Sequence, residues 1–416
     1  MAKNQYFPVL FWQKICIIWH KKGKIVPRLL FSLYGFAFFN KFLLLTPVYS
    51  IFMLENGLSD PQLSTMFIVS AFATIMGQMP IAFITNRMGQ RSAMILGQFL
   101  KAIAVLLWLV WPTYIGFVIG MILWGVQTGF RSVAFEGLVY DSVAVNGGAK
   151  NYTRILGRKS TYESIGTALS AFGSLLMFLG YAWVTWMSVA AIALSVVCLL
   201  NVRYTQSANV KPKTIPFKKQ FRVAMRVCRQ TPCLITTMVF ALLVGNVPYL
   251  DDFLSPIALQ IGIPTEYIGI VPLFLLGCAT LGQRFAYKFT RLSDWKIYML
   301  VGMVGLCYML FGATYSIATL WLMGVAYLLF YGIYTLMYSK VQHMIPSRHR
   351  SVVLSLYTTV NYSVYIIVCG IVGLGSLLGS WRFSIIILGA IILAICLWGF
   401  LFVGNKCNVS DNVRRV

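Results

Sequence analysis

The sequence predicts an all-α polytopic membrane protein with about twelve transmembrane helices, and three observations support that fold class. Hydrophobic residues make up 59% of the 416 residues and charged residues only 11%, whereas soluble domains average about 25% charged. Apolar stretches of roughly 20 residues, each long enough to span a bilayer as a helix, recur along the chain. Basic residues fall between alternate stretches. Strands are disfavoured, because membrane-barrel strands alternate polar and apolar residues and these stretches do not.

The predicted spans, in chain order, are residues 26–54, 61–84, 92–112, 114–140, 158–180, 182–202, 232–259, 264–286, 296–316, 318–339, 351–378 and 381–403. A basic polar segment, 203–231, lies at mid-chain and separates an N-terminal six-helix bundle, 26–202, from a C-terminal one, 232–403. Residues 1–25 are predicted to form a cytoplasmic amphipathic segment, since their apolar run is too short to span and is interrupted by polar residues. Residues 404–416 form a cytoplasmic tail.

The net charge of +24 is explained by topology. Of the 34 Lys and Arg residues, all but Lys41, Lys101, Arg131, Arg284 and Arg382 fall in the same set of alternate loops and ends. Positively charged loops stay on the cytoplasmic side, so both termini are predicted to be cytoplasmic, in a multi-pass protein of the cytoplasmic (inner) membrane. Lipids of the inner leaflet suffice as partners for this charge, and nucleic-acid binding is not expected.

Short repeats favour duplication of a six-helix unit. Paired motifs occur at offsets near half the chain length, namely Pro47 with Pro256, Gly77-Gln78 with Gly282-Gln283, and Gly-Ser-Leu-Leu at 173–176 and 375–378. Each match is short, but all three keep the same order, as expected for a transporter built from two structural repeats.

Three segments resemble motifs of the major facilitator superfamily (MFS) of secondary transporters. In residues 82–91 the family's Gly-x-x-x-Asp-Arg-x-Gly-Arg-Lys/Arg pattern is matched at Arg87, Gly89 and Arg91, whereas Asn86 replaces the Asp. Residues 136–142 are similar to the Glu-Ala-x-x-Tyr-Asp-Ser stretch of one branch, and residues 350–355 to its Arg-Ala-Thr-x-Leu-Ser. The resemblance covers essentially the whole chain and implies two pseudo-symmetric bundles that work by alternating access.

The resemblance also implies a cytoplasmic gate. Arg87 would pair with Asp141 at the end of the fourth span, and Gly89 would allow the tight turn between them. Asn86 lacks the negative charge that the family places opposite the eleventh helix, which weakens the expected latch between the halves. In the alternative interpretation, Arg87 and Arg91 only anchor the loop to lipid phosphates.

Charges inside predicted spans are costly and therefore point to function. Lys41 follows Asn40 near the middle of the first span, and Asp251 and Asp252 follow Tyr249 in the seventh. The resemblance implies that these two helices face each other across a central cavity. We expect Lys41 and one aspartate to interact or to share a substrate, and a buried pair that separates on protonation would couple proton movement to transport. A structural salt bridge is the alternative.

The remaining intramembrane charges are predicted to be structural. Arg131, Glu136 and Glu163 are expected to form a network towards the cytoplasmic side, or a second coupling site. Lys101, in a helix that the resemblance puts at the periphery, is expected to snorkel or to make a helix–helix contact. Polar and aromatic residues within spans are candidate cavity lining, and ordinary packing is the alternative for about half of them; they include Tyr34, Gln127, Asn246, Tyr331, Tyr334, Tyr357 and Asn361.

A secondary active transporter is therefore predicted, moving a small organic solute across the membrane with H⁺ as the coupling ion. A siderophore or similar bulky polar metabolite is the suggested substrate, and multidrug efflux is the alternative. A polytopic enzyme or a sensor is disfavoured, because the sequence has no histidine within a span, no metal-ligand spacing and no nucleophile elbow. No Walker motif is present, so the energy for transport is expected to come from an ion or solute gradient. The nine cysteines are scattered singly, so neither disulfides, a metal site nor a cofactor is expected. The protein is expected to be a monomer.

Overall fold

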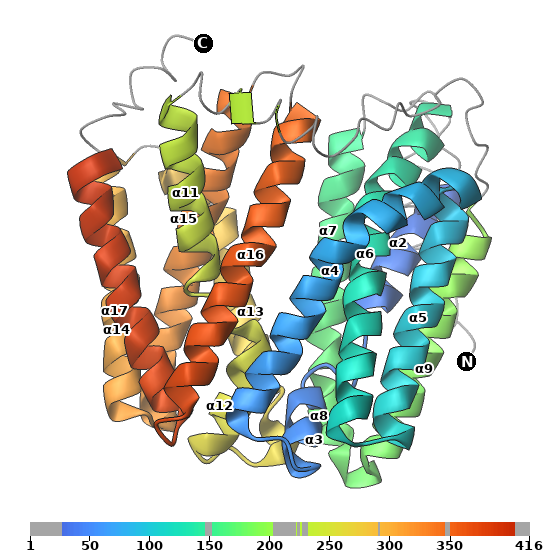
Figure 1. The fold of residues 1–416 in the computed structure, drawn as a ribbon, viewed down its shortest axis with the longest axis horizontal. Helices are drawn as coiled ribbons and strands as arrows, with labels where there is room; N and C mark the ends of the chain where they lie inside the picture. Colours follow the sequence, from blue (N-terminus) through green and yellow to red (C-terminus); the bar gives the residue numbers. More distant parts are fainter. Residues whose placement is uncertain are drawn as a thin grey trace, which may run out of the picture.

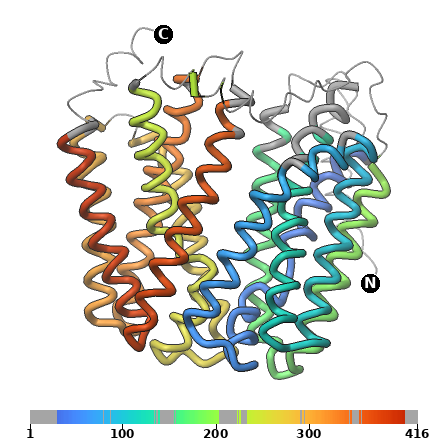
Figure 2. Tube along the Cα trace, viewed as in Figure 1, coloured from blue at the N-terminus to red at the C-terminus, as the bar shows by residue number. Residues whose placement is uncertain are grey.

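A computed structural model describes residues 27–145, 152–202, 222, 225–226, 232–289, 292–345 and 350–403. Within those residues all regular structure is helical. Figure 1 shows the helices of the first half gathered on one side and those of the second half on the other. The tube in Figure 2 separates the same two groups by colour, with blue to green in one and yellow to red in the other.

The first half consists of α2 (Pro27–Lys41), α3 (Tyr49–Glu55), α4 (Asp60–Met88), α5 (Gln90–Val110), α6 (Tyr114–Val145), α7 (Tyr152–Ser170), α8 (Phe172–Leu175), the 3₁₀ turn η2 (Leu176–Leu179) and α9 (Tyr181–Leu200). In this half α4 and α5 pack on α6, and α2 packs between α7 and α9.

The second half consists of α11 (Pro232–Asn246), η3 (Asp251–Phe253), α12 (Leu254–Gln260), η4 (Thr265–Tyr267), α13 (Ile270–Phe289), α14 (Asp294–Thr314), η5 (Ile317–Thr319), α15 (Leu320–Met344), α16 (Arg350–Ser376), α17 (Trp381–Trp398) and a π-helical turn, η7 (Gly399–Val403). Here α13 packs on α15, and α14 packs on α15 and α17. Between the halves, α4 packs on α16 and α3 on α12.

The predicted all-α membrane fold is confirmed. Nine helical segments within the described ranges are long and apolar enough to cross a membrane. The three remaining predicted spans correspond to α4 and α6, of 29 and 32 residues, and to the broken pair α2–α3. Each of these is also long enough to cross a bilayer. The twelve crossings predicted from the sequence are therefore accounted for.

Two of the spans predicted as continuous helices contain a longer non-helical segment in their interior. The first is interrupted between Lys41 and Tyr49, and the seventh between Asn246 and Asp251. Pro47 and Pro248 lie in the two breaks, and proline interrupts a helix because it has no N–H to donate and its ring clashes with the preceding turn. Pro256, which the sequence pairs with Pro47, lies inside α12 instead.

The expectation that the chain has no disulfide is wrong for Cys233, which is disulfide-bonded. No cysteine spacing in the sequence predicted this bond. Gly173, from the repeated Gly-Ser-Leu-Leu motif, explains one close contact between helices. A Cβ at this position would lie 1.8 Å from the carbonyl oxygen of Leu44, so only glycine lets α8 approach the first break.

Candidate functional site

A cavity of about 320 Å³ lies between the two halves, at the level of the two helix breaks. Its charged lining residues come from both halves. Lys41, Lys101 and Arg131 belong to the first half, whereas Asp251 and Asp252 belong to the second. Irregular backbone at membrane depth is tolerated only where it is buried in protein or lines such a cavity.

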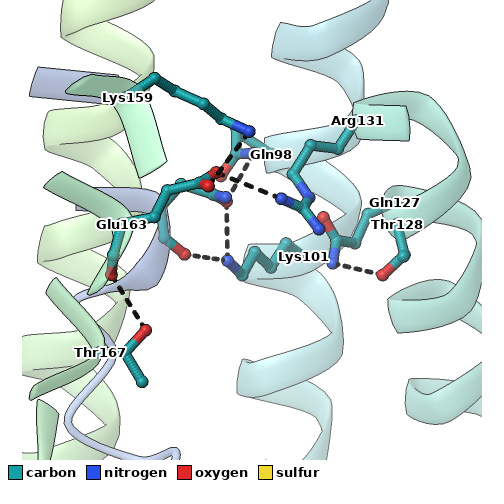
Figure 3. Close-up of polar contacts among 9 residues, drawn as sticks. Gln98, Lys101, Gln127, Thr128, Arg131, Lys159, Glu163 and Thr167 are labelled. Carbon is teal, nitrogen blue, oxygen red and sulfur yellow. Dashed lines mark hydrogen bonds and ion pairs between the residues drawn. The ribbon is translucent and has the colours of Figure 1, made fainter. Parts of the chain in front are cut away.

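The first break is stabilised by Lys101 of α5. Its Nζ donates to the carbonyl oxygen of Asn40 at 2.6 Å and to the Asn40 side-chain oxygen at 2.9 Å, and it lies 5.3 Å from the centre of the Trp124 ring. Gln98 donates to the same Asn40 side-chain oxygen at 3.2 Å. Figure 3 shows Lys101 reaching across the site between neighbouring helices. Asn40, predicted as a coupling residue, is thus the buried acceptor of these bonds.

Lys101 is 3% exposed, so the snorkelling alternative is wrong. The other expectation, a helix–helix contact, is confirmed, although the contact lies beside the central cavity and not at the periphery. The reason is that α2 ends early and leaves a main-chain carbonyl without a helical partner. A charged donor buried in the protein can satisfy that carbonyl and the neighbouring amide together.

Three hydroxyl groups satisfy further main-chain groups freed by the breaks. Ser188 Oγ accepts from the Leu45 N–H at 2.9 Å, and Ser255 Oγ donates to the Pro47 carbonyl at 2.7 Å. Tyr308 Oη donates to the Pro248 carbonyl in the second break. Each of these bonds is buried, where an unsatisfied main-chain group would be costly.

The two aspartates have different hydrogen-bond partners. Asp251 accepts from Tyr327 at 2.9 Å and from Tyr331 at 3.2 Å, and both tyrosines belong to α15. Asp252 accepts from Tyr365 of α16 and, at 3.1 Å, from Tyr49 of α3. Asp251 is therefore held entirely by the second half, whereas Asp252 joins the two halves.

Glu163 of α7 forms the two ion pairs found among the described residues, at 3.4 Å to Arg131 and at 3.1 Å to Lys159. Figure 3 shows the Glu163 carboxylate between these two cations. The predicted network of Arg131 with Glu163 is therefore present. Glu136, the third predicted member, has its side chain outside the described part of the structure.

Lys41 ends α2 and is exposed to the cavity. Among the described side chains no carboxylate lies within ion-pair distance of its Nζ, so the direct salt bridge offered as an alternative for Lys41 and the aspartates is absent here. The cation and the two carboxylates nevertheless line the same cavity.

Other predicted lining residues fall into two groups. Tyr249, Gln127 and Tyr331 line the cavity. Five others are found in contacts within one half: Asn246 donates to Asn361 at 2.9 Å, Tyr34 stacks on Tyr162, and Tyr338 packs between Tyr334 and Tyr357.

Sequence reasoning missed Tyr49, Trp108 and Trp124, which line the cavity and form a continuous aromatic stack. No sequence pattern singled them out, because they come from α3, α5 and α6. It also missed Tyr327, for which a signal existed. Tyr327 lies four residues before Tyr331, on the same face of α15 as the tyrosines that follow.

The predicted gate residues are only partly described. Gly89 connects α4 to α5 with φ of 82°, a conformation that glycine adopts without strain. Arg87 is exposed and lies 4.3 Å from the centre of the Phe83 ring. Arg91 donates to the carbonyls of Leu199 and Leu200 at the end of α9. The side chains of Asn86 and Asp141 lie outside the described residues.

A family model described as Major Facilitator Superfamily matches residues 30–369. The chain belongs to the Major Facilitator Superfamily. The protein is therefore a multi-pass membrane transporter and not an enzyme, as predicted from its sequence. No curated protein matches the chain.

Solved MFS structures share the fold at low sequence identity. The D-xylose–proton symporter aligns with a TM-score of 0.69 at 13% identity, covering 90% of this chain and 97% of that one. The nucleoside transporter NupG aligns at 0.69 and 11% identity, covering 90% and 98%. A POT family transporter in complex with a thioalcohol-conjugated peptide aligns at 0.68 and 15% identity, covering 92% and 96%. These likenesses concern the fold alone.

Proposed function

We propose that this MFS protein is a secondary active transporter that moves a compact polar organic solute by alternating access, coupled to protons. The observation that carries the proposal is the charged cavity, which both halves line at the level of two broken helices. Broken helices at mid-membrane form the substrate and ion sites of many secondary transporters. Charges held there without ion-pair partners are costly unless they serve transport.

The arrangement of the halves supports an inward-facing state. Described contacts between them include Ser255 with Pro47, the Gly269 N–H with Ser174 Oγ at 3.0 Å, and Gln260 with Asp60 at 3.3 Å. All of these lie near or beyond the breaks, towards the end whose loops carry few basic residues. The positive-inside rule assigns that end to the outside. The cavity in this state would then exchange solute with the cytoplasm.

Asp252 is the proposed coupling residue. Its carboxylate accepts from Tyr49 of the first half and from Tyr365 of the second. A protonated carboxyl group is a weaker hydrogen-bond acceptor than a carboxylate. Proton binding would therefore weaken the Tyr49 bond and favour separation of the halves at the outer end. Proton release on the other side would restore the bond.

The finer substrate prediction is a siderophore or similar bulky polar metabolite. The cavity volume lies near the lower end of the range for ligand pockets, which favours a compact member of that class. Multidrug efflux is the second candidate, and the stack of Tyr49, Trp108 and Trp124 favours it, because flat aromatic compounds could pack on such a surface.

The cytoplasmic gate remains part of the proposal. Arg87 lies at the end of α4, and Asp141 is in the last turns of α6, which packs on α4. If their side chains form the latch, Arg87→Ala will change the rate of conformational exchange. Unaltered exchange and transport in Arg87→Ala would remove the latch and leave the lipid-anchor interpretation.

The transport proposal can be tested in proteoliposomes that enclose a pH-sensitive dye. A transported solute should move protons when it is added, and should also exchange in counterflow. Closure of the outer end can be tested with the double variant Ser64→Cys/Gly373→Cys. The two Cβ atoms would lie 2.9 Å apart across α4 and α16, and a small shift of the helices apart gives the roughly 3.5–4.5 Å of a disulfide. Oxidation should stop transport and reduction should restore it, whereas either single variant should be insensitive. Transport that continues in the fully cross-linked protein would contradict alternating access at this interface.

A further inference from the structure

The charged side chains that line the cavity are divided by sign between the two halves of the protein. Its lining cations, Lys41, Lys101 and Arg131, all come from the first half. Its lining carboxylates, Asp251 and Asp252, come from the second. No ion pair crosses the cavity among the described residues, since both ion pairs found there involve Glu163 of the first half.

The three cations are not equivalent. Lys101 donates to two oxygens of Asn40, and Arg131 is paired with Glu163. Lys41 is exposed to the cavity, and no described hydrogen bond or ion pair satisfies its ammonium group. Lys41 is therefore the cation of this wall that is free to bind an anionic group.

The two carboxylates also differ in availability. Asp252 is only partly exposed and is held by tyrosines from both halves. Asp251 is exposed, and Tyr327 and Tyr331 hold it from one side of the cavity by one hydrogen bond to each oxygen. A carboxylate has about four acceptor positions, so Asp251 keeps acceptor capacity towards the cavity. As the more exposed of the two carboxylates, Asp251 is the anion placed to receive a cationic group.

A solute with a single charge would satisfy only one wall. An anion would leave Asp251 without a cation, and a cation would leave Lys41 without an anion, and unpaired charge is costly at membrane depth. A solute that carries both charges would neutralise both walls at once. Charged groups of opposite sign at fixed separation also set the orientation of the bound solute.

We propose that the transported solute is a zwitterion, with its anionic group bound at Lys41 and its cationic group bound at Asp251. This inference rests on the proposed transport function and specifies the substrate class of the same cavity. In such a complex the solute itself links the two halves. The charge separation in the solute must match the distance between the two walls, so the site should select among zwitterions by length.

Linear ω-amino acids from β-alanine to 8-aminooctanoate are suitable probes, with n-alkylamines and n-alkanoates of the same chain lengths as singly charged controls. Binding to the full-length protein can be followed by its tryptophan fluorescence, because Trp108 and Trp124 line the cavity. We expect one or two chain lengths of the amino acids to bind, and the matched amine and carboxylate to bind at least about tenfold more weakly.

Two variants assign the groups. The Lys41→Gln variant should bind the ω-amino acid no more tightly than it binds the matched alkylamine, because the carboxylate of the probe has lost its partner. The Asp251→Asn variant should bind the ω-amino acid no more tightly than it binds the matched alkanoate. Lys288→Gln and Glu266→Gln remove an exposed cation and an exposed anion that do not line the cavity, and they should keep the full discrimination.

Two results would overturn the zwitterion assignment. In the first, no ω-amino acid binds better than its singly charged controls. In the second, discrimination persists in both Lys41→Gln and Asp251→Asn. Either result leaves the transport proposal intact if another solute still shows counterflow and is blocked by the outer cross-link. Failure of the transport proposal has a different signature, in which ω-amino acids bind with the expected discrimination but neither they nor any other solute crosses the membrane.

Discussion

The two broken helices occupy similar positions in the two halves but are stabilised by opposite means. In the first break, a buried cation, Lys101, satisfies the end of α2, and Lys41 closes that helix. In the second break, Asp251 and Asp252 begin the helical segment that follows, and neutral tyrosine hydroxyls surround them. The cavity therefore has a cation, Lys41, at the first break and two carboxylates, Asp251 and Asp252, at the second.

Helix geometry favours the sign of the charge found at each break. The last turn of a helix exposes carbonyl oxygens and favours cations, whereas the first turn exposes N–H groups and favours anions. The first half contributes the C-terminal end of α2, and the second half contributes the N-terminal end of the segment formed by η3 and α12. A duplicated unit can thus give two walls of opposite charge, when each copy presents a different end of its broken helix.

The largest expected effect concerns the carboxylate that joins the halves. Asp252→Asn removes the proton-binding group but keeps a hydrogen-bonding side chain of the same size. We expect uptake driven by a pH gradient to fall by roughly 100-fold, while counterflow without a gradient continues. Glu266→Gln serves as the control. If Asp252→Asn retains the pH dependence of the unaltered protein, Asp252 is not the coupling residue, and the same assay on Asp251→Asn tests the other carboxylate.

An intermediate effect is expected for the cation of the first break. Lys101→Met keeps most of the side-chain volume but leaves two Asn40 oxygens without their charged donor. We expect the free energy of unfolding to fall by about 2 kcal/mol, observed as a lower thermal midpoint in detergent. Lys288→Met removes an exposed lysine near the inner end of α13 and should not change the midpoint. An unchanged midpoint in Lys101→Met would mean that the break does not depend on the ammonium group.

The smallest effects should come from the neutral partners, and they should be similar in the two breaks. Ser188→Ala removes the acceptor of the Leu45 N–H, and Tyr308→Phe removes the donor to the Pro248 carbonyl. Each should lower the free energy of unfolding by about 1 kcal/mol. Ser363→Ala, on an exposed position of α16, is the matched control. A much larger loss in one variant would show that the two breaks are not equivalent in stability.

The fold could be predicted from the sequence because only mostly apolar segments are stable in lipid, so membrane-spanning segments are recognisable by their composition. Long apolar runs must become helices in lipid, and their number and the two-bundle architecture follow from the chain. The charged residues Lys41, Asp251 and Asp252 could also be identified, because charge inside a span is rare and costly. In contrast, the breaks were not predicted. Pro47 and Pro248 are visible, but proline within a membrane helix produces either a kink or a break, and neighbouring helices decide which.

What the sequence alone determined is therefore the set of helices and the few charges placed within them, since both depend on transfer from water into an apolar environment. The tertiary structure decided the partner of each charge. The family resemblance placed Lys101 in a peripheral helix, yet Lys101 binds Asn40. The two adjacent aspartates differ because Asp252 accepts a hydrogen bond from Tyr49 of the opposite half. Such pairings depend on contacts between residues far apart in the chain, with a precision of a few ångströms, and the spacing of residues in one sequence does not encode them.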